Sequence, residues 1–227
     1  MEERVVSYYT TRMHSRKYLI VALVIGAIAG LFFASPFLQD LFFAVAGDAA
    51  AYARGHSLAA VVFFVLLAAF SAMISPFSSV AIIPFAVALW GVWTTSALLI
   101  LGWFIGDMIA YAVGRYAAHP LIAQFMKEET LTRYEHNLSD SMTLFRAFLL
   151  RLALPAEVGY AFGLIKYHFG AYMIVTVLAE VPFAFLTVRA ADALVTLDVR
   201  MFAVWTALLV VLVGAAYVFF TRSRHRA

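Results

Sequence analysis

Long apolar runs without charge constrain this chain more than any other feature of its sequence. Residues 18–38 contain no charged side chain, and a run of about 20 such residues is long enough to cross the hydrocarbon core of a bilayer as a helix. Hydrophobic residues make up 65% of the chain and charged residues 13%, far from the balance of a soluble domain. The sequence therefore predicts an all-α, polytopic integral membrane protein. Further apolar runs cover residues 58–74, 94–114, 171–188 and 202–220.

Proline interrupts two of the apolar segments. Ser75 and Pro76 break the first, and Pro155 breaks the second. Broken backbone at membrane depth needs protein or water to satisfy its freed amides and carbonyls, and paired broken segments point to a transporter's binding site. We therefore predict a helical bundle with two Pro-broken re-entrant hairpins in an inverted repeat, each followed by a long helix, at 58–115 and 143–190. The alternative is that both prolines only kink ordinary spanning helices.

Basic residues gather at the two ends of the chain and in its polar middle loop, residues 116–140. If both hairpins return to their own side, the termini and this loop share one side, which the positive-inside rule names cytoplasmic. We expect one membrane domain: residues 1–57 form an N-terminal tail, a first transmembrane helix and an interfacial segment, 58–192 the core, and 193–227 a last transmembrane helix and basic tail. The brevity of the chain favours a bacterial inner membrane.

The first apolar run has a second interpretation, a cleaved signal peptide. A signal core usually has about 7 to 15 apolar residues, and the run at 18–38 is longer. We therefore expect a retained transmembrane helix.

Asp107 lies inside a predicted span, where a charge costs about 2.5 to 3.5 kcal/mol at the bilayer centre. Asp107, Tyr111 and Arg115 are spaced four apart, so they share one helix face. Gly102 and Gly106 form a small-xxx-small pattern that permits close helix contact. We expect this face to point into the protein.

Arg146, Arg151 and Glu157 lie close together in the second broken segment. An arginine there suits a phosphate headgroup, because its guanidinium offers paired donors where water is scarce. A carboxylate beside it can be neutralised by taking up a proton. The alternative is that Arg151 and Glu157 form a structural ion pair that locks the hairpin.

Glu180 lies in the middle of a predicted span, with no cation near it in sequence. It is either part of the transport site or a protonated carboxyl group hydrogen-bonded to a neighbouring helix. Arg189 and Asp192 are one turn apart near a helix end, and they predict a simple interfacial pair.

Two motifs resemble the DedA-like superfamily, which includes the SNARE-associated Golgi, or VTT-domain, proteins. They are GDMIAYAVGR at residues 106–115 and RLALPAE at residues 151–157, the latter followed by Gly163 and Leu164. The resemblance covers roughly residues 58–192. It implies two re-entrant hairpins that meet near the midplane, and lipid translocation, including return of undecaprenyl phosphate in bacteria and phospholipid scrambling in eukaryotes.

The resemblance also implies which residues matter. It ties activity to Asp107, Arg115, Arg151 and Pro155, with Arg146 and Glu157 next to them. Many members carry an acidic residue ahead of the first hairpin's proline, whereas residues 72–76 here have none. This departure questions a proton relay through the first hairpin and implies the divergent, Golgi-type branch.

We expect a transporter that flips or scrambles a phosphate-bearing lipid, such as undecaprenyl phosphate or a phospholipid. The alternative is a proton-coupled transporter of a small solute or ion. Membrane lipids are the expected partners and protons a candidate coupling ion; nucleic acid is not expected, and the oligomeric state stays open. An enzyme, a cofactor and a metal are not expected either, because no nucleophile, metal cluster or acid and base pair stands at recognisable spacing.

Overall fold

The computed structural model describes residues 33, 35–74, 79–118, 142–153 and 158–224. All regular elements within these ranges are helical, which confirms the predicted all-α membrane fold. Three stretches are long and apolar enough to cross a bilayer: Ser79–Ala117, Phe169–Val195 and Val199–Ala216. A fourth crossing results if Pro36–Ala53 and Ser57–Met73 count together as one bent span. The first transmembrane helix predicted at 18–38 lies almost wholly outside the described residues.

Helix α2 (Pro36–Gly55) runs across the boundary between two compact units, Met1–Ala49 and Ala50–Ala227. Its start follows from the sequence. The Ser35 hydroxyl accepts a hydrogen bond from the Leu38 amide at 3.3 Å, and proline suits the first helical position because its missing N–H would have no partner there. The predicted interfacial segment is therefore helical.

The first broken segment consists of α3 (Ser57–Met73), the short 3₁₀ helix η1 (Ser79–Ile82) and α4 (Ile83–Val113). Inside α4, Gly91 has φ 71° and ψ 175°, a conformation that glycine adopts without a steric penalty. The helix therefore breaks there into a short and a long part. It ends in a π-helical turn, η2 (Gly114–Ala118).

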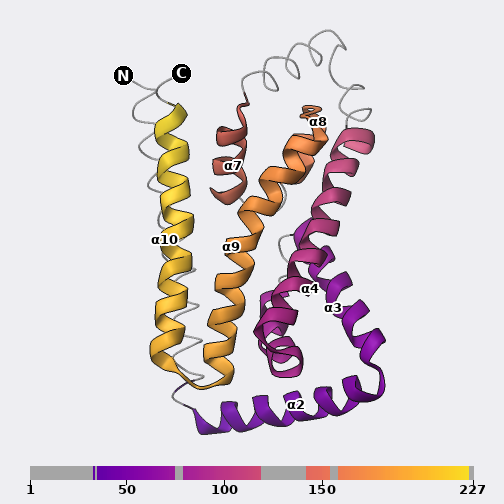
Figure 1. The fold of residues 1–227 in the computed structure, drawn as a ribbon, viewed down its shortest axis with the longest axis vertical. Coiled ribbons are helices and arrows are strands. Elements are labelled where there is room, and N and C mark those ends of the chain that lie inside the picture. Colours follow the sequence, from indigo (N-terminus) through magenta and orange to yellow (C-terminus); the bar gives the residue numbers. More distant parts are fainter. Residues whose placement is uncertain (1–32, 34, 75–78, 119–141, 154–157, 225–227) are drawn as a thin grey trace. The chain divides into compact units, whose positions relative to one another are not determined.

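The second broken segment consists of α7 (Leu144–Ala153), α8 (Val158–Leu164) and α9 (Phe169–Val195), followed by α10 (Val199–Arg224). Lys166 and Leu197 have positive φ angles of 53° and 56° at the turns before and after α9. Figure 1 shows η2, the start of α7 and the end of α10 at one end of the Ala50–Ala227 unit. The turn between α9 and α10 lies at the opposite end.

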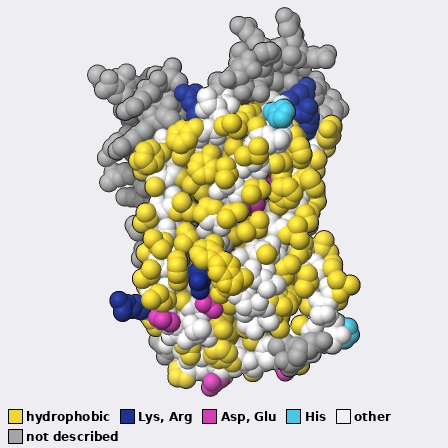
Figure 2. Space-filling view, viewed as in Figure 1, with side chains coloured by type: hydrophobic (Ala, Val, Ile, Leu, Met, Phe, Trp, Pro, Cys, Tyr) yellow, Lys and Arg dark blue, Asp and Glu magenta, His cyan; other side chains and the backbone are white. Residues whose placement is uncertain are grey.

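Helices α4 and α9 form the centre of this unit. One buried apolar cluster joins them to α3, and a second joins them to α7 and α8. Large hydrophobic side chains also cover the outside, as expected of a surface that contacts lipid. In Figure 2 most of the visible face is hydrophobic, and charged side chains gather mainly toward the two ends. The charged residues buried between α4, α7 and α9 depart from this pattern and therefore need an explanation.

Candidate functional site

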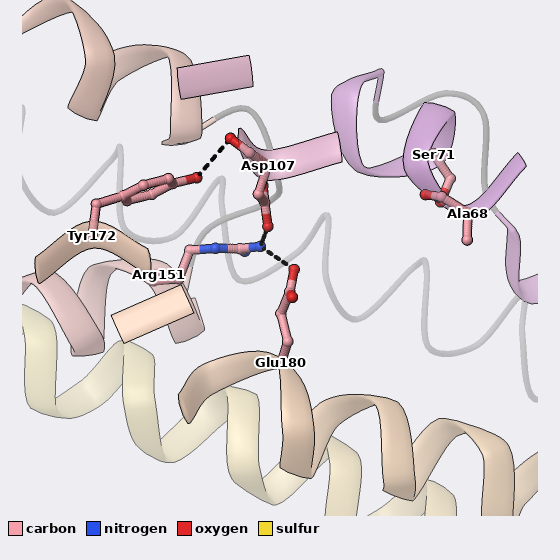
Figure 3. Close-up of polar contacts among 6 residues, drawn as sticks. All are labelled: Ala68, Ser71, Asp107, Arg151, Tyr172 and Glu180. Carbon is pink, nitrogen blue, oxygen red and sulfur yellow. Dashed lines mark hydrogen bonds and ion pairs between the residues drawn. The ribbon is translucent and has the colours of Figure 1, made fainter. Parts of the chain in front are cut away.

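Arg151 lies between two buried carboxylates in the middle of the bundle (Figure 3). Its Nη2 donates to Glu180 Oε1 at 2.8 Å and also to Asp107 Oδ2. Relative exposure is 9% for Arg151, 0% for Asp107 and 4% for Glu180. The three residues come from α7, α4 and α9, so this ionic triad joins three helices at one point.

Glycine on α4 determines where Asp107 lies. A Cβ atom on Gly106 would be 2.2 Å from the carbonyl oxygen of Ala69, and one on Gly102 would be 2.5 Å from the Cβ of Ala68. Helix α3 therefore packs directly on the α4 backbone, which confirms the close contact predicted from the small-xxx-small pattern. Asp107, the next residue, is turned to the neighbouring face, toward α7 and α9.

Helix α8 packs on the end of α4 through a second set of glycines, here called the glycine seam: Gly114, Gly159 and Gly163. A Cβ on Gly163 would lie 2.1 Å from the Tyr111 carbonyl oxygen, and one on Gly114 would lie 2.1 Å from the Tyr160 carbonyl oxygen. A Cβ on Gly159 would lie 2.7 Å from the Tyr172 hydroxyl. Only residues without a side chain permit backbones this close.

Two stacked tyrosines connect the triad to the η2 end of the bundle. The Tyr172 hydroxyl reaches the Asp107 carbonyl oxygen at 3.5 Å, and its ring stacks on Tyr111 with centroids 5.1 Å apart. The Tyr111 hydroxyl donates to the Tyr167 carbonyl oxygen and accepts from Arg115 Nη1 at 2.8 Å. Asp107, Tyr111 and Arg115 therefore lie along one inward-facing side of α4, as their spacing predicts.

The charges of the triad do not balance. Two carboxylates share one guanidinium, so the fully ionised triad carries a net charge of about −1. Within the described part of the chain, Asp107 Oδ1, Glu180 Oε2 and Arg151 Nε have no hydrogen-bond partner although they are buried. A buried polar atom left unpaired costs about 1 to 3 kcal/mol. The site is therefore suited to receive a proton, water or a polar ligand.

The described partners of Arg151, Asp107 and Glu180, are two that the sequence did not predict for it. The predicted partner, Glu157, lies outside the described residues, as does Pro155. Asp107 and Glu180 are 44 and 29 residues away along the chain. Glu180 has no cation near it in the sequence, but the fold brings Arg151 to it.

Arg146 is on the same helix as Arg151 but outside the triad, and its backbone amide donates to Thr143 Oγ1 at 3.3 Å. Ser75 and Pro76 fall outside the described residues. The interfacial pair predicted near the end of α9 is present, with Arg189 Nη1 3.8 Å from Asp192 Oδ2.

Tyr172 and Thr176 also belong to this part of the bundle and were not predicted from the sequence. Tyr172 is fully buried, and Thr176 is buried with no hydrogen-bond partner for its hydroxyl among the described residues. The signal was available, because Tyr172, Thr176 and Glu180 are spaced four apart and so share one face of α9.

Tyr160 on α8 connects the two broken segments. Its hydroxyl donates to the Met73 carbonyl oxygen at 3.1 Å, across 87 residues of chain. Met73 is the last residue of α3, where a carbonyl has no partner within its own helix. The end of α3 and helix α8 are therefore adjacent.

We predict that Tyr160→Phe lowers the free energy of unfolding by about 1 kcal/mol, because the Met73 carbonyl loses its donor. Thermal unfolding in detergent micelles measures this. Tyr116→Phe is the matched control, since that side chain is 73% exposed and its loss should leave stability unchanged. Equal stability of Tyr160→Phe and the wild type would contradict the role of this hydrogen bond.

The described residues contain no group of three or more His, Cys, Asp or Glu side chains that could hold a metal ion. The family model described as the VTT domain matches residues 75–193, a range that contains all three members of the triad. No curated protein and no solved structure matches the chain.

Proposed function

The chain belongs to the VTT-domain family of membrane transporter-like proteins, and from this premise we propose that it translocates a phosphate-bearing lipid whose headgroup is held by Arg151. Undecaprenyl phosphate and phospholipids are the substrates of this chemical class. In this proposal the protein acts as a transporter and not as an enzyme. Membrane lipids are its partners, and protons are its coupling ion.

The observation that carries the proposal is the burial of Arg151 between Asp107 and Glu180. A guanidinium is planar and offers five donors, which match the oxygens of a phosphate as well as those of carboxylates. The two carboxylates occupy one nitrogen of Arg151, and Nε has no partner among the described residues. A phosphate that enters would exchange with a carboxylate for the same group.

This exchange links headgroup binding to protons. A carboxylate that loses Arg151 stays buried, and a buried unpaired carboxylate is neutralised by protonation. Binding of an anionic headgroup is therefore expected to be accompanied by proton uptake at Glu180. The excess of carboxylates also supports the second candidate, a proton-coupled transporter of a small solute.

We further propose that the membrane is a bacterial inner membrane and that both termini are cytoplasmic. Apart from the buried Arg151, the basic residues in the described parts of α4, η2 and α7–α10 lie toward the two ends of these elements. Arg115, Arg146 and Lys166 lie at the end that carries η2, where α10 also ends with Arg222 and Arg224. Arg189 and Arg200 lie toward the turn between α9 and α10. By the positive-inside rule the first end faces the cytoplasm.

The test is transport by the purified full chain in lipid vesicles. We expect it to move labelled undecaprenyl phosphate or phosphatidylglycerol, to leave a neutral lipid without phosphate in place, and to respond to an imposed pH gradient. Proton flux with a solute and no lipid movement would favour the second candidate. No movement of phosphate-bearing lipid under any gradient would overturn the proposal.

The pH dependence should depend on Glu180. A proton taken up by Glu180 frees Arg151 for the phosphate, so the apparent KM for the lipid should fall as pH falls, about tenfold per pH unit for each linked proton. Asp107, Arg151 and Tyr172 are the other titratable groups at the site. In Glu180→Gln the plot of log KM against pH should lose the slope that corresponds to one linked proton. Asp40→Asn changes an exposed position of α2 and should keep the wild-type slope. An unchanged slope in Glu180→Gln would remove Glu180 from the coupling.

A further inference from the structure

A second arginine, Arg189, lies on α9 away from the triad, about two turns nearer the turn into α10. Its guanidinium carbon is 5.4 Å from the ring centroid of Phe185 and 5.8 Å from that of Trp205 on α10. Contacts of this kind are cation–π interactions. The two ring centroids are only 6.3 Å apart, so both rings lie on the same side of the guanidinium and leave its other side for further partners.

The N–H groups of Arg189 make few hydrogen bonds within the described residues. Among the described residues, Asp192 is the acidic side chain paired with Arg189, and its Oδ2 is 3.8 Å from Nη1, beyond the range of a hydrogen bond. Its Nε is buried and has no hydrogen-bond partner in the described ranges. The side chain is still 34% exposed, so a ligand can reach the group from outside the bundle.

The surroundings of Arg189 are those of a membrane boundary. Trp93, which is 73% exposed, packs near Phe185 with centroids 5.7 Å apart, and tryptophan is enriched where lipid headgroups meet hydrocarbon. Val199, Met201 and other large apolar side chains are exposed around the start of α10. In Figure 2 basic and acidic side chains gather toward this end of an otherwise hydrophobic face. Phosphate is the anion that lipids present at this depth.

We propose that Arg189, beside the rings of Phe185 and Trp205, is a second phosphate-binding site that takes the headgroup of an anionic lipid at the membrane boundary near the turn between α9 and α10. The rings contact one side of the guanidinium, and its remaining N–H groups donate to the phosphate oxygens. This site is separate from the triad, and the inference does not depend on the role of Arg151.

The experiment measures retention of phosphatidylglycerol and of phosphatidylcholine by the detergent-purified full chain, using native mass spectrometry. Arg189→Gln should lower phosphatidylglycerol retention about tenfold, the loss expected for a charge-assisted hydrogen bond. Asp192→Asn should raise retention, because it removes the neighbouring negative charge. Arg200→Gln is the matched control, since Arg200 is an exposed arginine at the same end of the bundle, and it should change retention less than twofold.

Titration with inorganic phosphate distinguishes the source of the ligand. Arg189-dependent retention of phosphatidylglycerol identifies a lipid headgroup, and Arg189-dependent binding of inorganic phosphate without lipid retention identifies a soluble phosphate at the same site. The inference is overturned if Arg189→Gln and Arg200→Gln behave alike, or if Asp192→Asn fails to raise binding of either ligand. Because Asp192→Asn predicts a gain, a folding defect in Arg189→Gln does not decide the outcome.

Discussion

Arg151→Gln is expected to abolish lipid transport and to lower the free energy of unfolding by about 3 to 5 kcal/mol, the cost of leaving buried charges without their partner. The effect is large because Arg151 Nη2 serves both Asp107 and Glu180. Its loss leaves two carboxylates facing each other at the junction of three helices. Denaturant titration of the purified protein measures stability, and the vesicle assay measures transport.

Two further variants separate the structural role of Arg151 from its transport role. The triple change Asp107→Asn, Arg151→Gln and Glu180→Gln removes all three charges together and should recover most of the stability, but not transport. Arg151→Lys keeps the charge and loses the planar donor group, so it should remain folded and transport slowly. Wild-type transport in the triple variant would show that the triad only holds the helices together.

Gly106→Ala is expected to lower the free energy of unfolding by about 3 kcal/mol, at the upper end of the usual cost of overpacking. The new methyl group would lie 2.2 Å from the Ala69 carbonyl oxygen, a backbone atom that moves only if α3 moves. Because Asp107 is the next residue, displacement of α3 and α4 should also disturb the triad and reduce transport. Thermal unfolding in micelles and the vesicle assay check both effects.

Gly214→Ala is the matched control for this substitution. Gly214 lies in α10, and a Cβ there would have nothing within 4 Å. Alanine is a better helix former than glycine by up to about 1 kcal/mol, so Gly214→Ala should be as stable as the wild type or slightly more so. If Gly106→Ala matches Gly214→Ala, the close packing of α3 on α4 is not a source of stability.

The fold was largely predictable because apolar length and proline position are local properties of the sequence. A long apolar run spans or enters the bilayer as a helix even when it contains one carboxylate, so the helices around Asp107 and Glu180 follow from the apolar pattern. The break at Gly91 could not be predicted, because glycine permits the φ and ψ angles found there but does not require them. Gly106 was recognised as a packing position because its spacing from Gly102 is itself local.

The sequence predicted which residues belong to the candidate site, but not which of them contact one another. Each of Asp107, Arg151 and Glu180 stands out by itself, because a charged side chain within a membrane span is costly. Which of them meet depends on how α4, α7 and α9 cross, and that is a property of the whole bundle. Sequence proximity favoured Glu157 for Arg151, a pair that lies outside the described residues, and the fold brings two distant carboxylates to the same arginine.

The glycine seam has a mechanical consequence. Helices slide past one another when a layer of side chains between them can change its rotamers, but at Gly114 and Gly163 the backbones of α4, η2 and α8 touch with no such layer. These elements should therefore move as one rigid body. In the proposed transport cycle, a motion that separates Arg151 from Asp107 would therefore displace α7 relative to α4, η2 and α8, and we expect α7 to be the element that moves.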